Sequence, residues 1–411
     1  MGSKYAWLGY VAIAGLAWGT YVPVVFYGGR ELTTDPSQLG GRLTSILCVG
    51  IAYFVLAVLI PLFLFLSKQH AWPPFKATGL AFSALAGVMG AVGAIAVIFA
   101  SKAAVFAAQE QGMPDGTYRM YIAPLIFGLA PVINTLVSLF WHPKPGNPWH
   151  FGLEKLPGPK LLGGILLVGL GAFLVLYAKE QNESPSAAAK KEVVPAVVEG
   201  KPEGTLQGGE PLVVPASGQW KYEWLGYVVL AGLAWGTYVP IVFYGGQELT
   251  GKPGDLGGRL MSILCVGMAY FLLAVLIPGA LMSSGAVNWP ASITTSGLAF
   301  SGLAGVAGAV GAICVIFASK AAVDAAKAQG IAPASFRVYI APLIFGLAPV
   351  INTLVSLLWH PKKAGDFLHF GLEQTPNPLL ALGIVCVGAG AFLVLLAKEQ
   401  SEAGPKPGGG K

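Results

Sequence analysis

The chain contains two copies of one long segment, and this duplication limits what it can fold into more than any other feature. Residues 4–33 read KYAWLGYVAIAGLAWGTYVPVVFYGGRELT, and residues 221–250 read KYEWLGYVVLAGLAWGTYVPIVFYGGQELT. Later stretches also return, among them GAFLVLYAKEQ as GAFLVLLAKEQ. We therefore expect two repeats of one fold, the first covering residues 1–181 and the second residues 221–400.

The two segments outside the repeats have a different composition. Residues 182–220 are polar and rich in Pro, Gly, Glu and Lys, and residues 401–411 include the run GPKPGGGK. Such segments bury too little apolar surface to offset the entropy lost on ordering. We expect a flexible linker at 182–220 and a disordered cytoplasmic tail at 401–411.

Apolar stretches dominate both repeats and point to a lipid environment. Hydrophobic residues make up 55% of the 411 residues and charged residues only 11%, which is less than half the usual charged share of soluble domains. A stretch of about 20 apolar residues spans a bilayer, and in lipid it must be helical to satisfy its backbone. The fold class predicted is an all-α integral membrane protein with ten transmembrane helices. The expected spans are 7–27, 43–66, 78–100, 121–141, 161–178, 224–244, 260–282, 296–318, 339–359 and 380–397.

Five spans in each repeat set the relative direction of the two copies. An odd number means that the second copy starts on the opposite side of the membrane, so the repeats are predicted to be inverted. Lys68 and Lys76 lie in the second loop of copy one, whereas the matching loop of copy two has no basic residue. The positive-inside rule then favours both termini in the cytoplasm of a multi-pass protein of the cell (inner) membrane.

Composition and motifs exclude several other classes. No block of Lys and Arg indicates a nucleic-acid partner, and the cysteines Cys48, Cys265, Cys314 and Cys386 have no metal-ligand spacing. Walker A, GxSxG and HExxH motifs are absent. We expect no enzyme activity, no cofactor and no metal. The predicted partners are a small-molecule solute and the lipid bilayer, and a homodimer is left open.

The first predicted helix of each repeat carries the sequence WGTYVP. Its proline frees a backbone carbonyl one turn earlier, near Gly19 in copy one, so the backbone there can face a polar solute. The alternative is that these residues only pack helices together. The substrate-binding candidates are Trp18, Thr20 and Tyr21 with their copies Trp235, Thr237 and Tyr238, and the hinge candidates are Pro23 and Pro240.

The fourth predicted helix supplies a second set of candidates. Asn134 and its copy Asn352 lie near the middle of their spans, where an amide is costly unless it faces a partner helix or a wet cavity. We expect these amides to hydrogen-bond either the substrate or a neighbouring helix. Pro131 and Pro349 on the same helices are further hinge candidates.

Charged residues bear on the charge of the solute. Asp and Glu are absent from the middle of every predicted span, which favours a neutral polar solute over a proton-coupled or cationic one. Basic residues flank the third and fourth helices, where they either contact an anionic solute or extend toward the membrane interface. The candidate anion contacts are Lys102, Arg119, Lys320 and Arg337.

The repeat architecture and the WGTYVP element together resemble the drug/metabolite transporter superfamily. Within it the chain is similar to the glucose/ribose porters and rhamnose transporters, and more distantly to the ureide permeases. The resemblance covers about residues 4–181 and 221–400, and it implies a substrate cavity between the repeats that opens alternately to each side. Two departures are the close likeness of the halves and the long linker.

These observations together predict a secondary transporter of a small polar metabolite, a sugar or a similar neutral solute. Because the halves are so alike, exchanging their conformations should interconvert two states of similar free energy, which suits a bidirectional carrier. Two alternatives stay open. The first is a carrier of anionic metabolites that uses Lys and Arg at helix ends, and the second is a non-transporting membrane scaffold subunit.

Overall fold

The computed structural model describes most of both repeats. It covers residues 5–33, 39–113, 118–144, 146–152, 158–183, 222–251, 255–330, 340–359, 361, 367–371 and 377–402. The predicted linker and tail lie outside these residues, apart from the final turns of two helices that end at Glu183 and Glu402. Arg337 also lies outside them.

Across the described residues the protein is all-helical, apart from isolated β-bridges in loops. The helices of the first repeat are α1 (Ala6–Glu31), α2 (Leu39–Phe54), α3 (Ile60–Leu66), α4 (Ala77–Glu110), α5 (Arg119–Phe140) and α6 (Pro159–Glu183). Those of the second are α8 (Glu223–Thr250), α9 (Leu256–Phe271), α10 (Ile277–Ser283), α11 (Thr295–Ala328), α13 (Ile340–Leu358) and α14 (Pro378–Glu402).

The second span of each repeat is one helix with a widened turn. A π-helical segment at Val55–Leu59 joins α2 to α3, and Leu272–Leu276 joins α9 to α10 in the same way. Pro61 and Pro278 follow directly, and each lacks the N–H of a regular helical bond and crowds the carbonyl four residues earlier. The widened turn is the local solution to that crowding.

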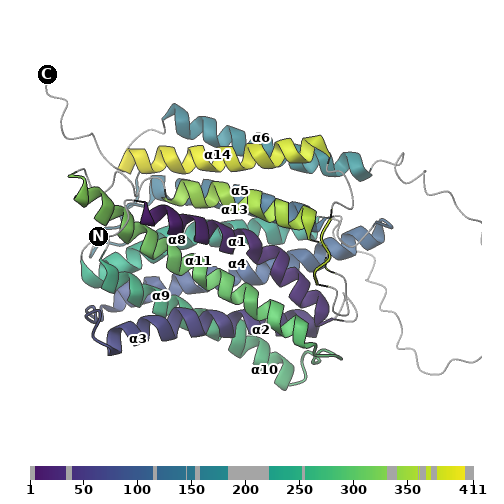
Figure 1. Cartoon of the computed structure of the whole chain (residues 1–411), viewed down its shortest axis with the longest axis horizontal. Coiled ribbons are helices and arrows are strands. Elements are labelled where there is room, and N and C mark those ends of the chain that lie inside the picture. The colour runs from purple at the N-terminus through teal and green to yellow at the C-terminus, as the bar shows by residue number, and fades with distance from the viewer. Residues whose placement is uncertain are drawn as a thin grey trace, which may run out of the picture.

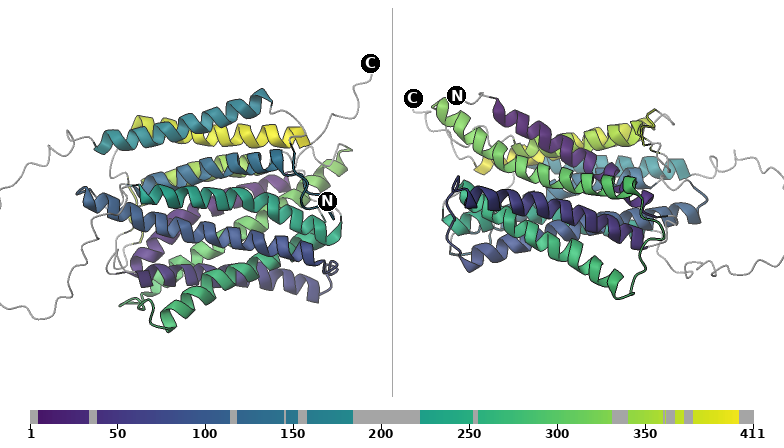
Figure 2. Two further views of the ribbon diagram at one scale, coloured as in Figure 1. Left: turned by 180° about the vertical axis from the view of Figure 1, so that it is seen from behind. Right: turned by 60° about the horizontal axis from the view of Figure 1, so that its bottom comes forward.

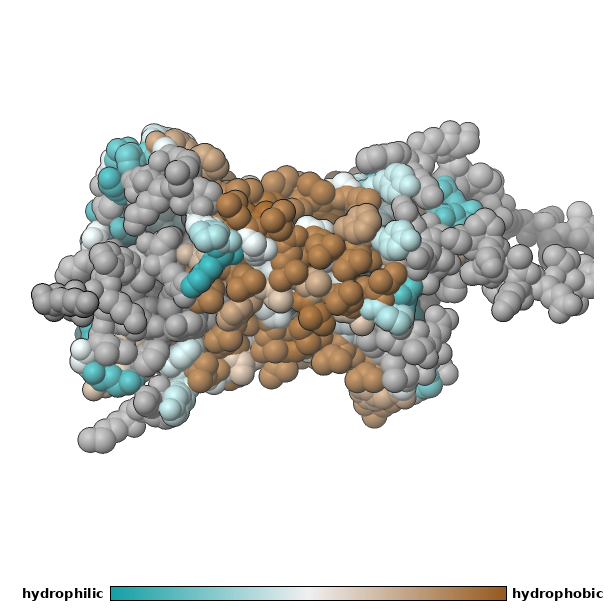
Figure 3. Space-filling model, turned by 90° about the horizontal axis from the view of Figure 1, so that it is seen from above, coloured by the Kyte–Doolittle hydropathy of each residue, from teal (hydrophilic) through white to brown (hydrophobic). Residues whose placement is uncertain are grey.

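Six helical stretches within the described residues are long and apolar enough to cross a membrane. They are Ala6–Glu31, Leu39–Leu66, Ala77–Glu110, Glu223–Thr250, Leu256–Ser283 and Thr295–Ala328. Shorter apolar stretches lie in α5, α6, α13 and α14. The space-filling view shows a broad apolar band around the middle of one face, with polar residues at both ends (Figure 3). The chain is a multi-pass membrane protein.

The helices form one bundle in which the repeats are interleaved (Figure 1). α6 and α14 lie side by side at one edge, and the α2–α3 and α9–α10 helices lie at the other (Figure 2). Between them α1 packs mainly on α11 and α13 of the other repeat, and α8 packs in the same way on α4 and α5. The first helix of each repeat therefore packs mainly against helices of the other repeat.

Contacts between equivalent helices show that they cross in opposite directions. A Cβ added at Gly50 of α2 would lie 2.7 Å from Val275, and one added at Gly267 of α9 would lie 2.7 Å from Val58. Gly50 and Gly267 are equivalent positions, and so are Val58 and Val275, which lie eight residues further along. The earlier position of each helix thus meets the later position of its copy, which happens only when the two helices run antiparallel. α6 and α14 follow the same rule, because Gly164 lies against Val394 and Gly383 against Val175.

The third predicted span of each repeat ends too early. The third predicted spans stop at residues 100 and 318, but α4 runs on through Glu110 and α11 through Ala328. Lys102 and Lys320 therefore lie within helices rather than after them. Alanines continue the helical pattern past these lysines, but a charged residue interrupts the apolar stretch there, so hydrophobicity alone ends the predicted span too early.

Candidate functional site

A cavity of about 100 Å³ lies between the repeats and is walled mainly by aromatic side chains. We call these side chains the aromatic cage. α1 and α8 supply Trp and Tyr, α2 and α9 supply Tyr, and α5 and α13 supply Phe. The members of the cage are Trp18, Tyr21, Tyr53, Phe127, Trp235, Tyr238, Tyr270 and Phe345.

Two equivalent tyrosines meet in the cage. Tyr53 and its copy Tyr270 stack with ring centroids 4.4 Å apart and planes within 4° of each other. Their hydroxyls lie beside the hydroxyls of Tyr238 and Tyr21 respectively. Residues at equivalent positions of the two repeats therefore contribute to one cage.

The two cage tryptophans are fixed by matched contacts. Trp18 Nε1 donates a hydrogen bond of 3.2 Å to the Gly308 carbonyl, and Trp235 Nε1 donates one of 3.2 Å to the Gly90 carbonyl. Each bond joins the first helix of one repeat to the third helix of the other. Added Cβ atoms at Gly93 and Gly311 would collide with these indoles. The glycines of the third helices therefore make room for the cage walls.

The sequence-based candidates divide into those that line the cavity and those that do not. Trp18, Tyr21, Trp235 and Tyr238 line it. The Thr20 hydroxyl instead donates 2.8 Å to the Leu16 carbonyl of its own helix, and Thr237 donates 2.9 Å to the Leu233 carbonyl. Both threonines thus bond to the backbone one turn back.

The Asn352 amide joins two helices. Its Nδ2 donates 3.2 Å to the Gly19 carbonyl, the one that Pro23 leaves without a helical partner. The freed carbonyl is therefore satisfied by an interhelical bond, the structural alternative considered for these amides. Asn134 is equally buried on α5, which packs closely against Gly236 of α8.

The hinge candidates all lie inside continuous helices. They are Pro23, Pro131, Pro240 and Pro349.

The candidate anion contacts have unlike surroundings. Lys320 is 49% exposed and forms a 2.7 Å salt bridge with Asp324 one turn on. Phe106 replaces that aspartate in the first repeat, and Lys102 lies with its Nζ 5.5 Å from the Phe106 ring. Arg119 stacks over Phe26 with its Cζ 5.8 Å from the ring centroid. None of the three described residues lines the cage.

A second cavity of about 40 Å³ adjoins the cage on the side of the second repeat. We call it the vestibule. It shares Trp18, Tyr238, Val239 and Ala312 with the cage. Its outer wall contains Phe243 and two polar residues, Arg259 and Ser262.

Two buried carboxylates lie away from both cavities. Glu248 accepts hydrogen bonds from Thr78 Oγ1 at 3.2 Å and from the Gly146 N–H at 2.9 Å. Its copy Glu31 accepts one from Ser296 Oγ at 2.9 Å. Each carboxylate lies in the last turn of its repeat's first helix, although the predicted spans end at residues 27 and 244. Its hydrogen bonds join that turn to the start of α4 or α11 in the other repeat, where the helix dipole favours negative charge.

Sequence reasoning missed Tyr53 and Tyr270 of the cage, Arg259 of the vestibule, and its copy Arg42. The tyrosines are mid-span phenols within an AYF triplet present in both copies, and that signal was available. The arginines stand in GGRL close to helix starts, where a position near the interface is the ordinary interpretation.

Comparisons with known proteins leave the function to be argued from geometry. No model of a protein family matches the chain, and no curated protein matches it.

Proposed function

We propose that the protein is a secondary transporter that moves a small polar metabolite across the membrane by alternating access. In this proposal the shorter apolar helices also span the bilayer, giving ten spans as two inverted five-helix repeats, and the solute binds in the aromatic cage. The antiparallel crossings of α2 with α9 and of α6 with α14 support the inverted arrangement. The location in the cell (inner) membrane and the cytoplasmic position of both termini stay predictions.

One observation carries the alternating-access proposal. Residues at equivalent positions on the two sides of the cage differ in burial. Val22 and Val25 of α1 are 3% and 2% exposed, and Val97 of α4 is fully buried. Their copies Val239, Val242 and Val315 are half-buried and line the vestibule.

This difference cannot come from the residue types, because each valine is matched by a valine. It arises from the positions of the helices around them. A carrier that opens first to one side and then to the other must hold its two halves in unlike conformations at any moment, and inverted repeats make those conformations interchangeable.

The cage favours a compact solute with at least one apolar face. Indole and phenol rings pack against the C–H faces of sugars and the planes of heterocycles, while phenol hydroxyls supply hydrogen bonds. Among the described residues that line it, none carries a carboxylate, so the cage offers no anionic partner to a cation. A sugar or a similar neutral solute was the sequence-based expectation and stays the leading substrate class. The scaffold alternative is disfavoured, because a scaffold needs no cavity between the repeats.

Transport into vesicles tests this proposal. Purified full-length protein in proteoliposomes should exchange at least one solute from a panel of labelled sugars, ureides, uronates and sugar phosphates with saturable kinetics. Trp18→Ala should abolish that exchange while leaving the elution volume in detergent unchanged. If no solute in the panel moves and none shifts the melting temperature, the scaffold alternative replaces the transporter.

A further inference from the structure

Arg259 brings a positive charge to the wall of the vestibule. It lies in the first turn of α9, is only 9% exposed, and its Cζ is 5.4 Å from the Phe243 ring centroid. Burying a guanidinium is costly unless charge or hydrogen bonds compensate it, so such residues in membrane-spanning helices commonly mark a solute pathway. Here the side chain borders a cavity that shares four lining residues with the cage.

Ser262 adds a polar group to the same wall, on the same helix and one turn further on. Its hydroxyl donates 2.8 Å to Ser83 Oγ and lies 3.1 Å from the Val242 carbonyl, so its position is fixed. The described residues that line the vestibule include no Asp or Glu. Arg259 and Ser262 thus form the polar part of an otherwise apolar chamber.

The copy of Arg259 lies in a very different place. Arg42 is 7% exposed, and its Nη1 lies 3.4 Å from the Ile98 carbonyl of α4. It also interacts electrostatically with Arg119 and Lys102. The valines that would form the wall of a matching vestibule, Val22 and Val25, are buried. Arg42 is not among the described residues that line the cage or the vestibule.

We infer that the vestibule is the subsite for an anionic group of the solute, and that the solute is a small organic carboxylate whose remaining body packs in the aromatic cage. Arg259 takes the carboxylate in the state described here, and Arg42 takes it in the state open to the opposite side. The inference rests on the proposed transport function, and it changes the expected solute from a neutral sugar to a monoanion. One guanidinium suits a single negative charge.

Counterflow in proteoliposomes tests the inference with matched probes. D-glucose, D-glucuronate and D-glucose 6-phosphate share a ring but differ in charge. We expect saturable counterflow of glucuronate, at least about tenfold faster than that of glucose, because a charge-assisted hydrogen bond contributes that much or more to binding. Arg259→Gln and Arg42→Gln should each slow glucuronate counterflow about tenfold or more, and Arg259→Lys should retain part of the rate.

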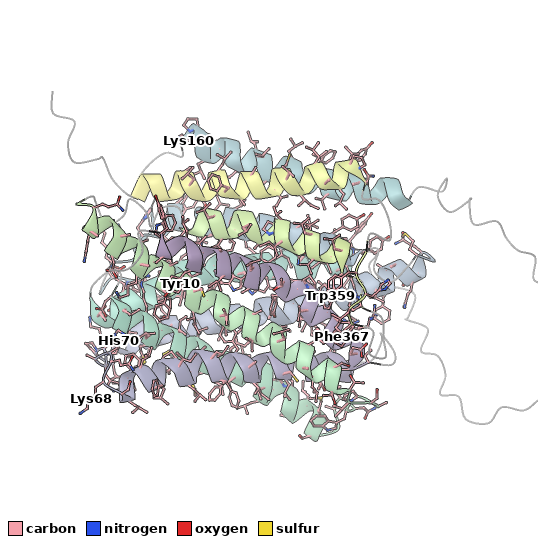
Figure 4. The ribbon with its side chains drawn as sticks, viewed as in Figure 1. Tyr10, Lys68, His70, Lys160, Trp359 and Phe367 are labelled. Carbon is pink, nitrogen blue, oxygen red and sulfur yellow. The ribbon has the colours of Figure 1, made fainter. Side chains whose placement is uncertain are left out.

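The control variant is Lys160→Gln, which removes a positive charge from the exposed start of α6 (Figure 4). Its rate should equal that of the parent protein. Elution volume and melting temperature in detergent identify any arginine variant that fails to fold, and Arg259→Lys then carries the test.

Each other outcome overturns the inference in a recognisable way. Glucose counterflow that is unaffected by either arginine substitution leaves the transporter standing and removes the anionic subsite. A preference for glucose 6-phosphate shows that the subsite serves a dianionic phosphate rather than a carboxylate. If none of the three probes moves or shifts the melting temperature, the carboxylate inference fails, and the wider solute panel then decides whether the transport proposal fails with it.

Discussion

The two halves of this protein have almost the same sequence but not the same conformation. The first helix reads WGTYVP in both, and Trp18 and Trp235 make the same hydrogen bond to the opposite repeat. Yet Val22 is buried where Val239 lines an open vestibule. A duplicated sequence therefore does not require a symmetric molecule. It requires only that the state in which the two halves exchange conformations be close in free energy to the state described here, so that each half can adopt the conformation of the other.

The largest expected effect comes from the cage tryptophans. Trp18→Ala and Trp235→Ala should each slow solute exchange more than about 100-fold, because each removes an aromatic wall that contacts the solute and a hydrogen bond between repeats. Solute counterflow measures the loss. Trp→Phe at each position is the control and should retain part of the rate. If only one of the two alanine variants is impaired, the halves do not share one site.

Close helix packing provides the next test of equivalence. An added Cβ at Gly305 would lie 2.5 Å from the Val49 carbonyl, and one at Gly87 would lie 2.7 Å from the Val266 carbonyl. Gly305→Ala and Gly87→Ala should each lower the free energy of unfolding by about 1–3 kcal/mol, because overpacked helices must separate. Thermal unfolding in detergent measures the change.

Gly302→Ala is the matched control for that test. A Cβ at Gly302 meets nothing within 4 Å, and the first repeat already has Ala84 at this position. The substitution should be neutral or stabilise the protein by about 0.4–1 kcal/mol through the unfolded chain. Destabilisation as large as that of Gly305→Ala would show that the close contact is not the cause.

The mid-span amides should have a smaller effect. Asn352→Ala removes the bond to the Gly19 carbonyl and should cost about 0.6–2 kcal/mol, the usual range for interhelical bonds in membranes. Asn134→Ala should cost a similar amount. The neighbouring Thr353 bonds only the Pro349 carbonyl of its own helix among the contacts described, so Thr353→Ala serves as the control. If Asn352→Ala leaves stability unchanged but weakens solute binding, the amide belongs to the site.

The smallest effect is expected at an exposed position where the halves differ in charge. Lys320 and Asp324 form an exposed salt bridge on α11, whereas α4 has Lys102 and Phe106. Asp324→Ala should change the free energy of unfolding by less than about 0.5 kcal/mol, because solvent screens exposed pairs. The change should fade further in high salt. A salt-independent loss of more than 1 kcal/mol would contradict this assignment.

Several features followed from the sequence alone. The repeats, the apolar helices and four of the cage residues could be read from the printed letters, because helical periodicity and the mid-span position of WGTYVP are local properties. The Tyr53–Tyr270 stack could not be predicted in this way. It depends on the register of two antiparallel helices from different repeats, which no local pattern encodes.

Two other features lay beyond the sequence for different reasons. The Gly19 carbonyl was expected to face solute, but Asn352 reaches it from another repeat, and only the packing of α1 against α13 reveals this. The unequal burial of Val22 and Val239 is invisible in principle, because the local sequences are nearly identical. Which half is open is a property of the conformational state.

Side-specific labelling tests the central claim most directly. In a background with Cys48, Cys265, Cys314 and Cys386 replaced by alanine, Val22→Cys and Val239→Cys are introduced one at a time. A membrane-impermeant thiol reagent is then added to either face of oriented vesicles. The account predicts that the cysteine at position 239 reacts from one face only and the cysteine at position 22 only from the opposite face. Reaction of both cysteines from the same face would contradict it.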